Sequence, residues 1–191
     1  MGWDFSTEPE FQEKLDWVEQ FCREEVEPLD MIFPYAVRSK DPKIKALVKP
    51  LQDQVKAQGL WALFLDQELG GPGLGQLKLG LLNEILGRYG SAPQIFGAAA
   101  PDTGNMEVLV HYGSEEQKQT WLMPLLAGEI RSAFCMTEPN VASSDATNMA
   151  ATAKVEGDEV VLNGRKWWST GVGHPDCKVL IFMGLSNPDA P

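Results

Sequence analysis

The spacing of apolar residues changes part-way along the chain, and this change constrains the fold more than any other feature. Before Gly128, apolar side chains recur about every 3.6 residues, the period of an amphipathic helix. After Gly128 the period falls to about 2 and the residues become β-branched and aromatic, which is typical of strands. We therefore expect an α+β protein. It has an all-α helical bundle over residues 1–130 and the first part of an antiparallel β-barrel or sandwich over residues 131–191.

Five helices are expected in the first part. Thr7 fits the N-cap of the first helix, Glu10 is placed for a capping box, and Pro28 ends the helix. Periodicity predicts an inward face in two later helices, made of Leu47, Leu51 and Val55 in one and of Leu77, Leu81, Ile85 and Tyr89 in the next. The four later helices are expected over residues 43–58, 75–89, 94–111 and 114–126. The helix over residues 43–58 is expected to end at a left-handed Gly59, and Ser114-Glu115-Glu116-Gln117 is expected to cap the start of the last helix.

Short strands are expected in the second part. They lie over residues 133–137, 151–155, 160–162, 166–169 and 178–185. Gly157 lies in the first turn between them, and Asn163-Gly164 is a strong type I′ hairpin signal for the next. A sheet this small, with an unpartnered last edge, suggests that the second domain is incomplete.

Charge and cysteine usage exclude several classes of protein. The net charge is −11, and residues 1–30 hold ten acids against two bases, so nucleic acid is not the expected partner. No apolar run approaches the roughly 20 residues that a membrane span needs. The three cysteines are an odd number, widely spaced at Cys22, Cys135 and Cys177, and they form neither a paired framework nor a metal knuckle. We expect a cytoplasmic protein.

The familiar catalytic constellations are missing from the sequence. His111 and His174 are the only histidines, and no nucleophile elbow, Walker loop or zinc-protease helix accompanies them. His174 and Cys177 have the spacing of metal ligands, but two ligands make half a zinc site. We therefore expect no metal and no hydrolase chemistry.

Two segments fit a flat cofactor. The run over residues 133–145 is a strand that breaks at Pro139 into small and hydroxylated residues, which allow a ligand to approach the backbone closely. In the second segment, strand alternation would place Trp168 and Thr170 on one face and Trp167 on the other. Trp168 could then stack on a ring while Thr170 donates a hydrogen bond. Alternatively, both tryptophans anchor the sheet.

The sequence resembles the acyl-CoA dehydrogenase family. Five motifs carry the resemblance in the family's order: Leu69-Gly70-Gly71-Pro72-Gly73-Leu74, His111-Tyr112-Gly113-Ser114-Glu115-Glu116-Gln117-Lys118, Leu125-Leu126-Ala127-Gly128-Glu129, Met136-Thr137-Glu138-Pro139 and Asn163-Gly164-Arg165-Lys166. The resemblance implies the family's N-terminal helical domain and the start of its middle β domain. It also implies FAD as the cofactor.

The first segment carries several residues that the resemblance assigns to FAD. It implies that the strand from Phe134 to Thr137 lies along the flavin, with Met136 and Thr137 offering hydrogen bonds to the ring edge. Ser144 matches a serine near the FAD pyrophosphate and the acyl-CoA. One more residue than usual separates the signature glutamate from the following aspartate, so Ser143 is its rival.

The second segment supplies the remaining expected cofactor contacts. By the resemblance, Trp168 packs against the flavin, Ser169 follows on the same backbone, and Thr170 hydrogen-bonds near flavin N5. Gly171 stands where many relatives carry asparagine. We read Glu138 as a structural carboxylate that bonds local backbone, rather than as a catalytic base.

The resemblance implies α,β-dehydrogenation of an acyl-CoA thioester. The base that removes the α-proton is expected beyond residue 191, so no catalytic residue is assigned here. An electron-transfer flavoprotein is the expected electron acceptor, and the complete protein is expected to be a homodimer or homotetramer. Two alternatives stay open: a non-catalytic binding or assembly module of the same fold, and a related flavin-dependent acyl-CoA oxidase or nitroalkane oxidase.

Overall fold

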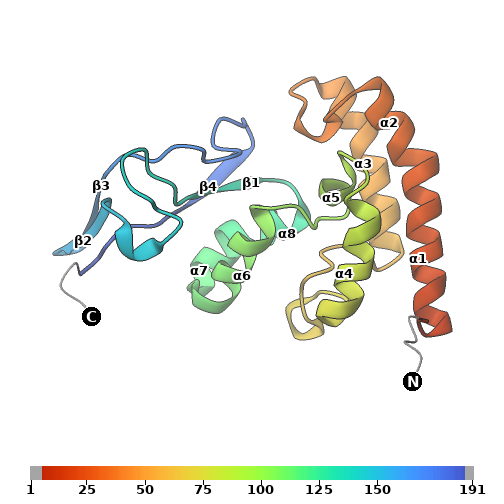
Figure 1. Cartoon of the computed structure of the whole chain (residues 1–191), viewed down its shortest axis with the longest axis horizontal. Coiled ribbons are helices and arrows are strands. Elements are labelled where there is room, and N and C mark those ends of the chain that lie inside the picture. The colour runs from red at the N-terminus through yellow and green to blue at the C-terminus, as the bar shows by residue number, and fades with distance from the viewer. Residues whose placement is uncertain (1–5, 188–191) are drawn as a thin grey trace. The chain divides into compact units, whose positions relative to one another are not determined.

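The computed structural model describes residues 6–187, which divide into two compact units (Figure 1). Unit 1 extends to Thr103 and is helical, and unit 2 begins at Gly104 and contains helices and strands. The boundary between compact units thus precedes the change of period near residue 130. Residues 1–130 and 131–191 remain our prediction for the evolutionary domains.

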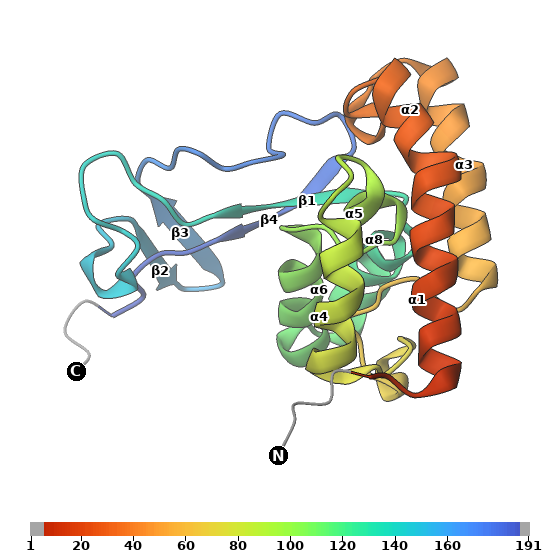
Figure 2. The same ribbon diagram turned by 45° about the vertical axis from the view of Figure 1, so that its right-hand side comes forward.

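Unit 1 is built from helices that run alongside one another (Figure 2). Its α-helices are α1 (Pro9–Phe21), α2 (Glu27–Ile32), α3 (Pro42–Ala57), α4 (Gly75–Leu86) and α5 (Ala92–Ile95). A π-helical turn, Cys22–Val26, joins α1 to α2, and 3-10 turns form at Ala36–Arg38 and Gln67–Leu69.

Aromatic rings form the centre of the unit 1 core. The Phe96 side chain is fully buried and meets the rings of Trp17 and Phe21 edge-on, at centroid distances of 6.5 and 5.8 Å. Trp17 and Phe21 stack on each other at 4.8 Å. Edge-to-face and stacked pairs are the arrangements that aromatic quadrupoles favour. The segment after α5 is therefore fixed against the apolar face of α1.

The first helix differs from expectation at both ends. Thr7 is not its N-cap, because Glu8 takes that position without a side-chain cap and the Thr7 hydroxyl donates to Gln12 instead. Pro28 does not end the helical path, which continues through α2 to Ile32. A proline ring clashes with the carbonyl four residues earlier, and the wider π turn just before Pro28 relieves that clash.

The predicted inward faces of two helices are confirmed except at the first residue of each. Leu51, Val55 and Ile85 are buried, whereas Leu47 and Leu77 are exposed, and Leu77 keeps 80% of its surface. The buried face of α4 also includes Leu82 and Leu86. The helix expected over residues 94–111 is replaced by α5 and α6. Gly59 is left-handed at φ 67°, as predicted for the residue after α3.

Unit 2 begins within α6 (Asp102–Tyr112), followed by α7 (Glu115–Gln117) and α8 (Met123–Ala127). The predicted cap is confirmed and is a capping box, since the Ser114 hydroxyl accepts from Gln117 N and the Gln117 side chain accepts from Ser114 N. A second π turn, Lys118–Leu122, again lies two residues before a proline. Within this unit the buried Asn105 amide donates to the Ser132 hydroxyl at 2.8 Å.

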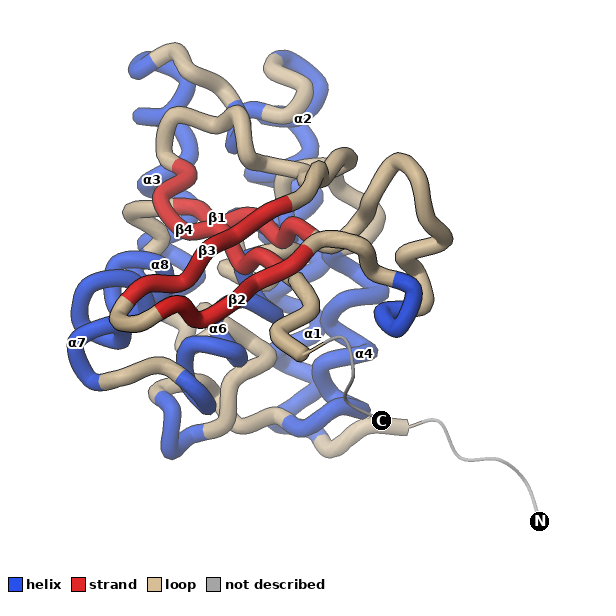
Figure 3. Tube along the Cα trace, turned by 90° about the vertical axis from the view of Figure 1, so that its left-hand side faces the viewer, coloured by secondary structure: helices blue, strands red, loops and turns tan. Residues whose placement is uncertain are grey.

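The strands of unit 2 form two separate pairs (Figure 3). β1 (Arg131–Cys135) pairs in parallel with β4 (Cys177–Phe182), and β2 (Thr152–Glu156) pairs antiparallel with β3 (Glu159–Asn163). The hairpin turn at Gly157 is as predicted. The expectation of a wholly antiparallel sheet was wrong, because the long connection from β1 to β4 returns the chain in the same direction. No closed barrel forms among residues 6–187.

The strand expected over residues 166–169 does not form, and Asn163-Gly164 makes no hairpin. Gly164 is required for a different reason. A Cβ at this position, with φ 150°, would lie 2.5 Å from the Ala151 Cβ, so only glycine lets the two segments approach.

Over the described part of the chain, no helix has the length and apolar character needed to cross a membrane.

The aromatic centre of unit 1 predicts a large difference between two substitutions. Phe96→Ala should lower the free energy of unfolding by about 3–5 kcal/mol, because it leaves a cavity among buried rings. Leu77→Ala, at an exposed helix position, should change it by less than about 0.5 kcal/mol. Urea unfolding followed by tryptophan fluorescence measures both. Equal effects would contradict this description of the core.

Cysteine reactivity gives a second test. Burial raises the pKa of the Cys22 thiol to about 12, helped by the nearby carboxylates of Glu19 and Asp30, whereas Cys177 is only partly buried. Because the thiolate is the reactive form, iodoacetamide at about pH 8 should modify Cys177 long before Cys22. Mass spectrometry of the alkylated peptides measures the two rates. Rapid modification of Cys22 without unfolding would contradict its placement.

Candidate functional site

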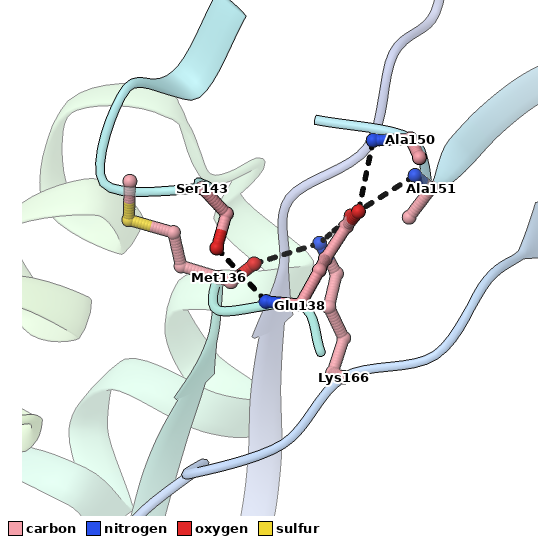
Figure 4. A network of polar contacts seen from close by, with 6 residues as sticks. All are labelled: Met136, Glu138, Ser143, Ala150, Ala151 and Lys166. Atoms are coloured by element: carbon pink, nitrogen blue, oxygen red, sulfur yellow. Dashed lines mark hydrogen bonds and ion pairs between the residues drawn. The ribbon is translucent and has the colours of Figure 1, made fainter. Parts of the chain in front are cut away.

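A buried carboxylate joins three segments of unit 2 (Figure 4). Glu138, 5% exposed, follows β1, and one of its oxygens accepts from Lys166 Nζ at 2.7 Å and from Ala151 N at 2.9 Å. The other oxygen accepts from Ala150 N at 2.9 Å. One side chain therefore holds the end of β1, the start of β2 and the segment around Lys166 together. This confirms Glu138 as a structural carboxylate.

The Lys166 ammonium is fixed from several sides. Besides the Glu138 carboxylate, it donates to the carbonyl oxygen of Met136 at 2.9 Å and lies 5.1 Å from the centroid of the Phe182 ring of β4. Its side chain is 7% exposed. Hydrogen bonds between charged partners are shorter and stronger than neutral ones, and a cation over a ring face is attracted by the ring quadrupole.

The environment keeps this carboxylate ionised. The hydrogen bond from Lys166 is the largest cause of a lowered Glu138 pKa, and the backbone amides of Ala150 and Ala151 add to it. Burial acts in the opposite direction but does not prevail. A carboxylate with a lowered pKa and three donors is a weak proton acceptor. Glu138 is therefore poorly suited to be a catalytic base.

The two rival serines occupy different environments. Ser143 is buried, and its hydroxyl accepts from Glu138 N at 2.9 Å, which closes the turn after the strand. Ser144 is exposed. The Ser143 hydroxyl is thus engaged inside the protein, while Ser144 can be reached by a ligand.

The segment around the tryptophan pair follows no strand. Trp167 N donates to the carbonyl oxygen of Thr137 at 3.0 Å, and Trp168 then turns into the left-handed region at φ 54°. The expected alternation, with Trp168 and Thr170 on one strand face, was therefore wrong. A tight turn replaces it, in which Thr170 N donates to Trp168 O at 2.9 Å. A bulky residue in this conformation costs about 1–3 kcal/mol, and such strain clusters at ligand sites.

The same segment fits a flat, polar-edged ligand. Trp168 is 78% exposed and Trp167 lies beside it, with ring centroids 5.7 Å apart. The Ser169 hydroxyl oxygen is buried and has no hydrogen-bond partner, so a donor or acceptor is missing there. Thr170 is exposed. The exposed Trp168 indole and the exposed Thr170 hydroxyl thus offer a flat ligand a stacking surface and a hydrogen bond.

The other expected cofactor residues lie at the end of β1: Phe134 is within the strand, and Met136 and Thr137 follow it. Phe134 and Met136 are half-buried, and Thr137 is exposed. The carbonyl oxygens of Met136 and Thr137 already accept from Lys166 and from Trp167 N. Contacts from these two residues to a ligand would come from their amide or side-chain atoms.

The sequence reasoning missed Lys166 as a structural partner of the site. A lysine next to two tryptophans, downstream of a buried glutamate, was the available signal. His174 and Cys177 have the spacing of metal ligands, but His174 Nδ1 accepts a hydrogen bond from Asp176 N at 3.2 Å. Residues 6–187 hold no group of three or more potential metal ligands.

Comparisons with known proteins agree with the sequence motifs. The model of the acyl-CoA dehydrogenase N-terminal domain matches residues 8–129, and the model of the middle domain of the same family matches residues 133–190. Acyl-CoA dehydrogenase family member 10 of Mus musculus is 44% identical over 189 residues, and family member 11 of Gallus gallus is 48% identical over 178 residues. These alignments cover 96% and 91% of this chain, but 18% and 22% of the relatives.

Solved structures show the same fold. A Mycobacterium abscessus protein that carries the acyl-CoA dehydrogenase name has 52% identity and a TM-score of 0.87, over 97% of this chain and 48% of its own. The FAD complex of PigA has 25% identity and a TM-score of 0.71, over 98% of this chain and 46% of its own. The chain therefore spans about half the length of these solved relatives and less of the curated ones.

The ionised Glu138 predicts a specific acid response. A carboxyl whose folded-state pKa is lowered contributes stability above its unfolded value, here about 4.5, and that stability is lost as pH falls through the lowered folded value. Chemical unfolding between about pH 6 and pH 3 should therefore show a loss of stability that Glu138→Gln reduces. Glu156→Gln, at an exposed position of β2, is the control. A Glu138→Gln profile parallel to wild type would refute the lowered pKa.

Proposed function

The chain belongs to the acyl-CoA dehydrogenase family, and on that premise we propose that it forms part of the FAD and acyl-CoA site of an FAD-dependent acyl-CoA dehydrogenase. The observation that carries the proposal is the exposed, left-handed Trp168, followed directly by the unsatisfied Ser169 hydroxyl. The FAD complex of PigA, which shares the fold, supports the choice of cofactor.

Each residue of the site has a proposed task. The indole of Trp168 covers one face of the flavin ring of FAD. The hydroxyls of Ser169, Thr170 and Thr137 form hydrogen bonds with polar atoms at the edge of that ring. Phe134 and Met136 border the same region from β1. Ser144, the exposed serine, contacts the FAD pyrophosphate and the acyl-CoA, while Ser143 keeps the turn closed. Together these side chains orient the ligands and exclude water from one side of the reaction.

The proposed reaction is α,β-dehydrogenation of an acyl-CoA thioester. When bound, FAD supplies the oxidant that takes up hydride from the β-carbon. Removal of the α-proton needs a carboxylate that is free to accept it. Glu138 does not meet this requirement, because Lys166 and two backbone amides occupy it. We place the base in a part of the enzyme outside residues 1–191.

The partners follow from the same proposal. Reduced flavin must pass its electrons on, and an electron-transfer flavoprotein is the proposed acceptor. We also propose a homodimer or homotetramer for the complete enzyme. None of the three cysteines forms a disulfide in the described residues, and we propose a cytoplasmic location, where thiols stay reduced.

A non-catalytic assembly module is the second candidate. Several apolar side chains of the β2–β3 hairpin are exposed, among them Val155, Val160 and Leu162. Apolar surface of this kind is usually covered by protein. This observation fits an assembly role, but it does not account for the strained Trp168 and the unsatisfied Ser169.

Flavin content separates the two candidates. The protein, expressed in the longest form that its gene encodes, should show flavin absorbance between about 350 and 500 nm. Trp168→Ala should weaken FAD binding about two- to tenfold, because a stacked aromatic contact contributes about 0.5–1.5 kcal/mol. Trp121→Ala, which removes a partly exposed tryptophan of the same unit, should leave FAD binding unchanged.

Two outcomes would contradict the proposal. Absence of flavin from the wild-type protein, even with added FAD, would favour the assembly module. Equal FAD affinity for wild type and Trp168→Ala would remove Trp168 from the site. Residues 1–191 alone should also fail to oxidise any acyl-CoA, since the base is not among them. Turnover by that fragment would refute the assignment of the base.

A further inference from the structure

The residue that precedes the exposed tryptophan pair attaches it to the rest of unit 2. Lys166 immediately precedes the pair, and its ammonium contacts the Glu138 carboxylate, the Met136 carbonyl oxygen and the Phe182 ring. These partners lie beyond the end of β1 and at the end of β4, so the anchor joins the segment to both strands of the parallel pair.

The backbone adds a second attachment one residue later. Trp167 N donates to the carbonyl oxygen of Thr137 at 3.0 Å, next to the carbonyl that Lys166 contacts. Trp168 is the first residue without such an attachment, and it is left-handed and exposed. A strained backbone conformation persists only where its surroundings over-determine it. Residues 166 and 167 provide that constraint.

We propose that the Glu138–Lys166 ion pair positions the segment 166–170, so that the Trp168 indole and the Thr170 hydroxyl meet the flavin in a single orientation. Glu138 and Lys166 are positioning residues, because they are buried and act through Trp168. This inference rests on the proposed function and adds to it the interaction that sets the geometry of the ring contact.

The chemistry of the pair suits this task better than apolar packing would. A buried ion pair contributes little net stability compared with well-packed apolar residues, since both charges lose their hydration. Its hydrogen bonds are directional, however, and the carboxylate is itself fixed by Ala150 N and Ala151 N. Removing the pair should therefore alter the orientation of the segment more than the survival of the fold.

The test uses the protein in the longest form that its gene encodes, with three variants. Glu138→Gln removes one charge at nearly constant shape, and the double variant Glu138→Leu/Lys166→Met removes both without leaving a buried charge unpaired. Lys166→Arg keeps the charge and the donors and should behave like wild type. Leu122→Ala, buried in the helical part of unit 2, is the control for general destabilisation.

The first measurement is amide hydrogen exchange without flavin. Exchange at residues 167–171 should rise about tenfold in Glu138→Gln and in the double variant, because the segment opens locally. The second measurement is the fluorescence of FAD at saturating concentration. An indole held against the ring quenches the flavin, so bound FAD should become several-fold brighter in both variants, and Lys166→Arg should restore the quenching.

Each result has a defined meaning. Faster exchange together with brighter bound flavin supports the proposal, provided that Leu122→Ala shows neither change. Unchanged exchange in both variants overturns it, and so does faster exchange with unchanged fluorescence. Failure of the wild-type protein to bind FAD overturns the proposed function, and this inference with it. That failure is visible in wild type alone, before any variant is compared.

Discussion

The arrangement of unit 2 depends on the compensation of one buried negative charge. A carboxylate without partners at the position of Glu138 would be too costly to bury, so the surrounding segments must supply donors. The Lys166 ammonium and the adjacent amides of Ala150 and Ala151 supply them, from two different parts of the chain. The water that would hydrate the Glu138 carboxylate is replaced by these hydrogen bonds, which form only when the segments that carry the donors lie next to Glu138. The need to pair the buried carboxylate therefore fixes which segments of unit 2 must lie together in the folded chain.

The sequence predicted correctly the caps and turns that depend only on interactions between neighbouring residues. The Ser114 cap, the left-handed Gly59 and the Gly157 hairpin turn depend on a few neighbouring residues, and all three are confirmed. The end of the first helix was wrong because the π turn before Pro28 is a response of the backbone that no residue type announces. The burial of Leu77 was wrong because it begins the predicted face of α4, and only the later part of that face packs in the core.

The sequence predicted which segments form the candidate site, but it did not predict how their side chains and backbone are arranged. The motifs located the residues around β1 and the tryptophan pair, but period-2 alternation suggested a strand where Lys166 and Trp167 hold an irregular path. The choice between Ser143 and Ser144 could not be made by spacing. It depends on which hydroxyl accepts from Glu138 N, and that is set by how the turn closes in space.

The β2–β3 hairpin leaves one strand edge open. β2 bonds on its other side to Leu185, but β3 has no second neighbour among the described strands, is exposed along its whole length, and its Val160-Val161-Leu162 run has high strand propensity. Unpaired backbone donors and acceptors beside apolar side chains are a template for adding further strands. We therefore expect intermolecular β-pairing at the open edge of β3 to be the route by which residues 1–191 would associate, and a lysine on β3 to oppose it.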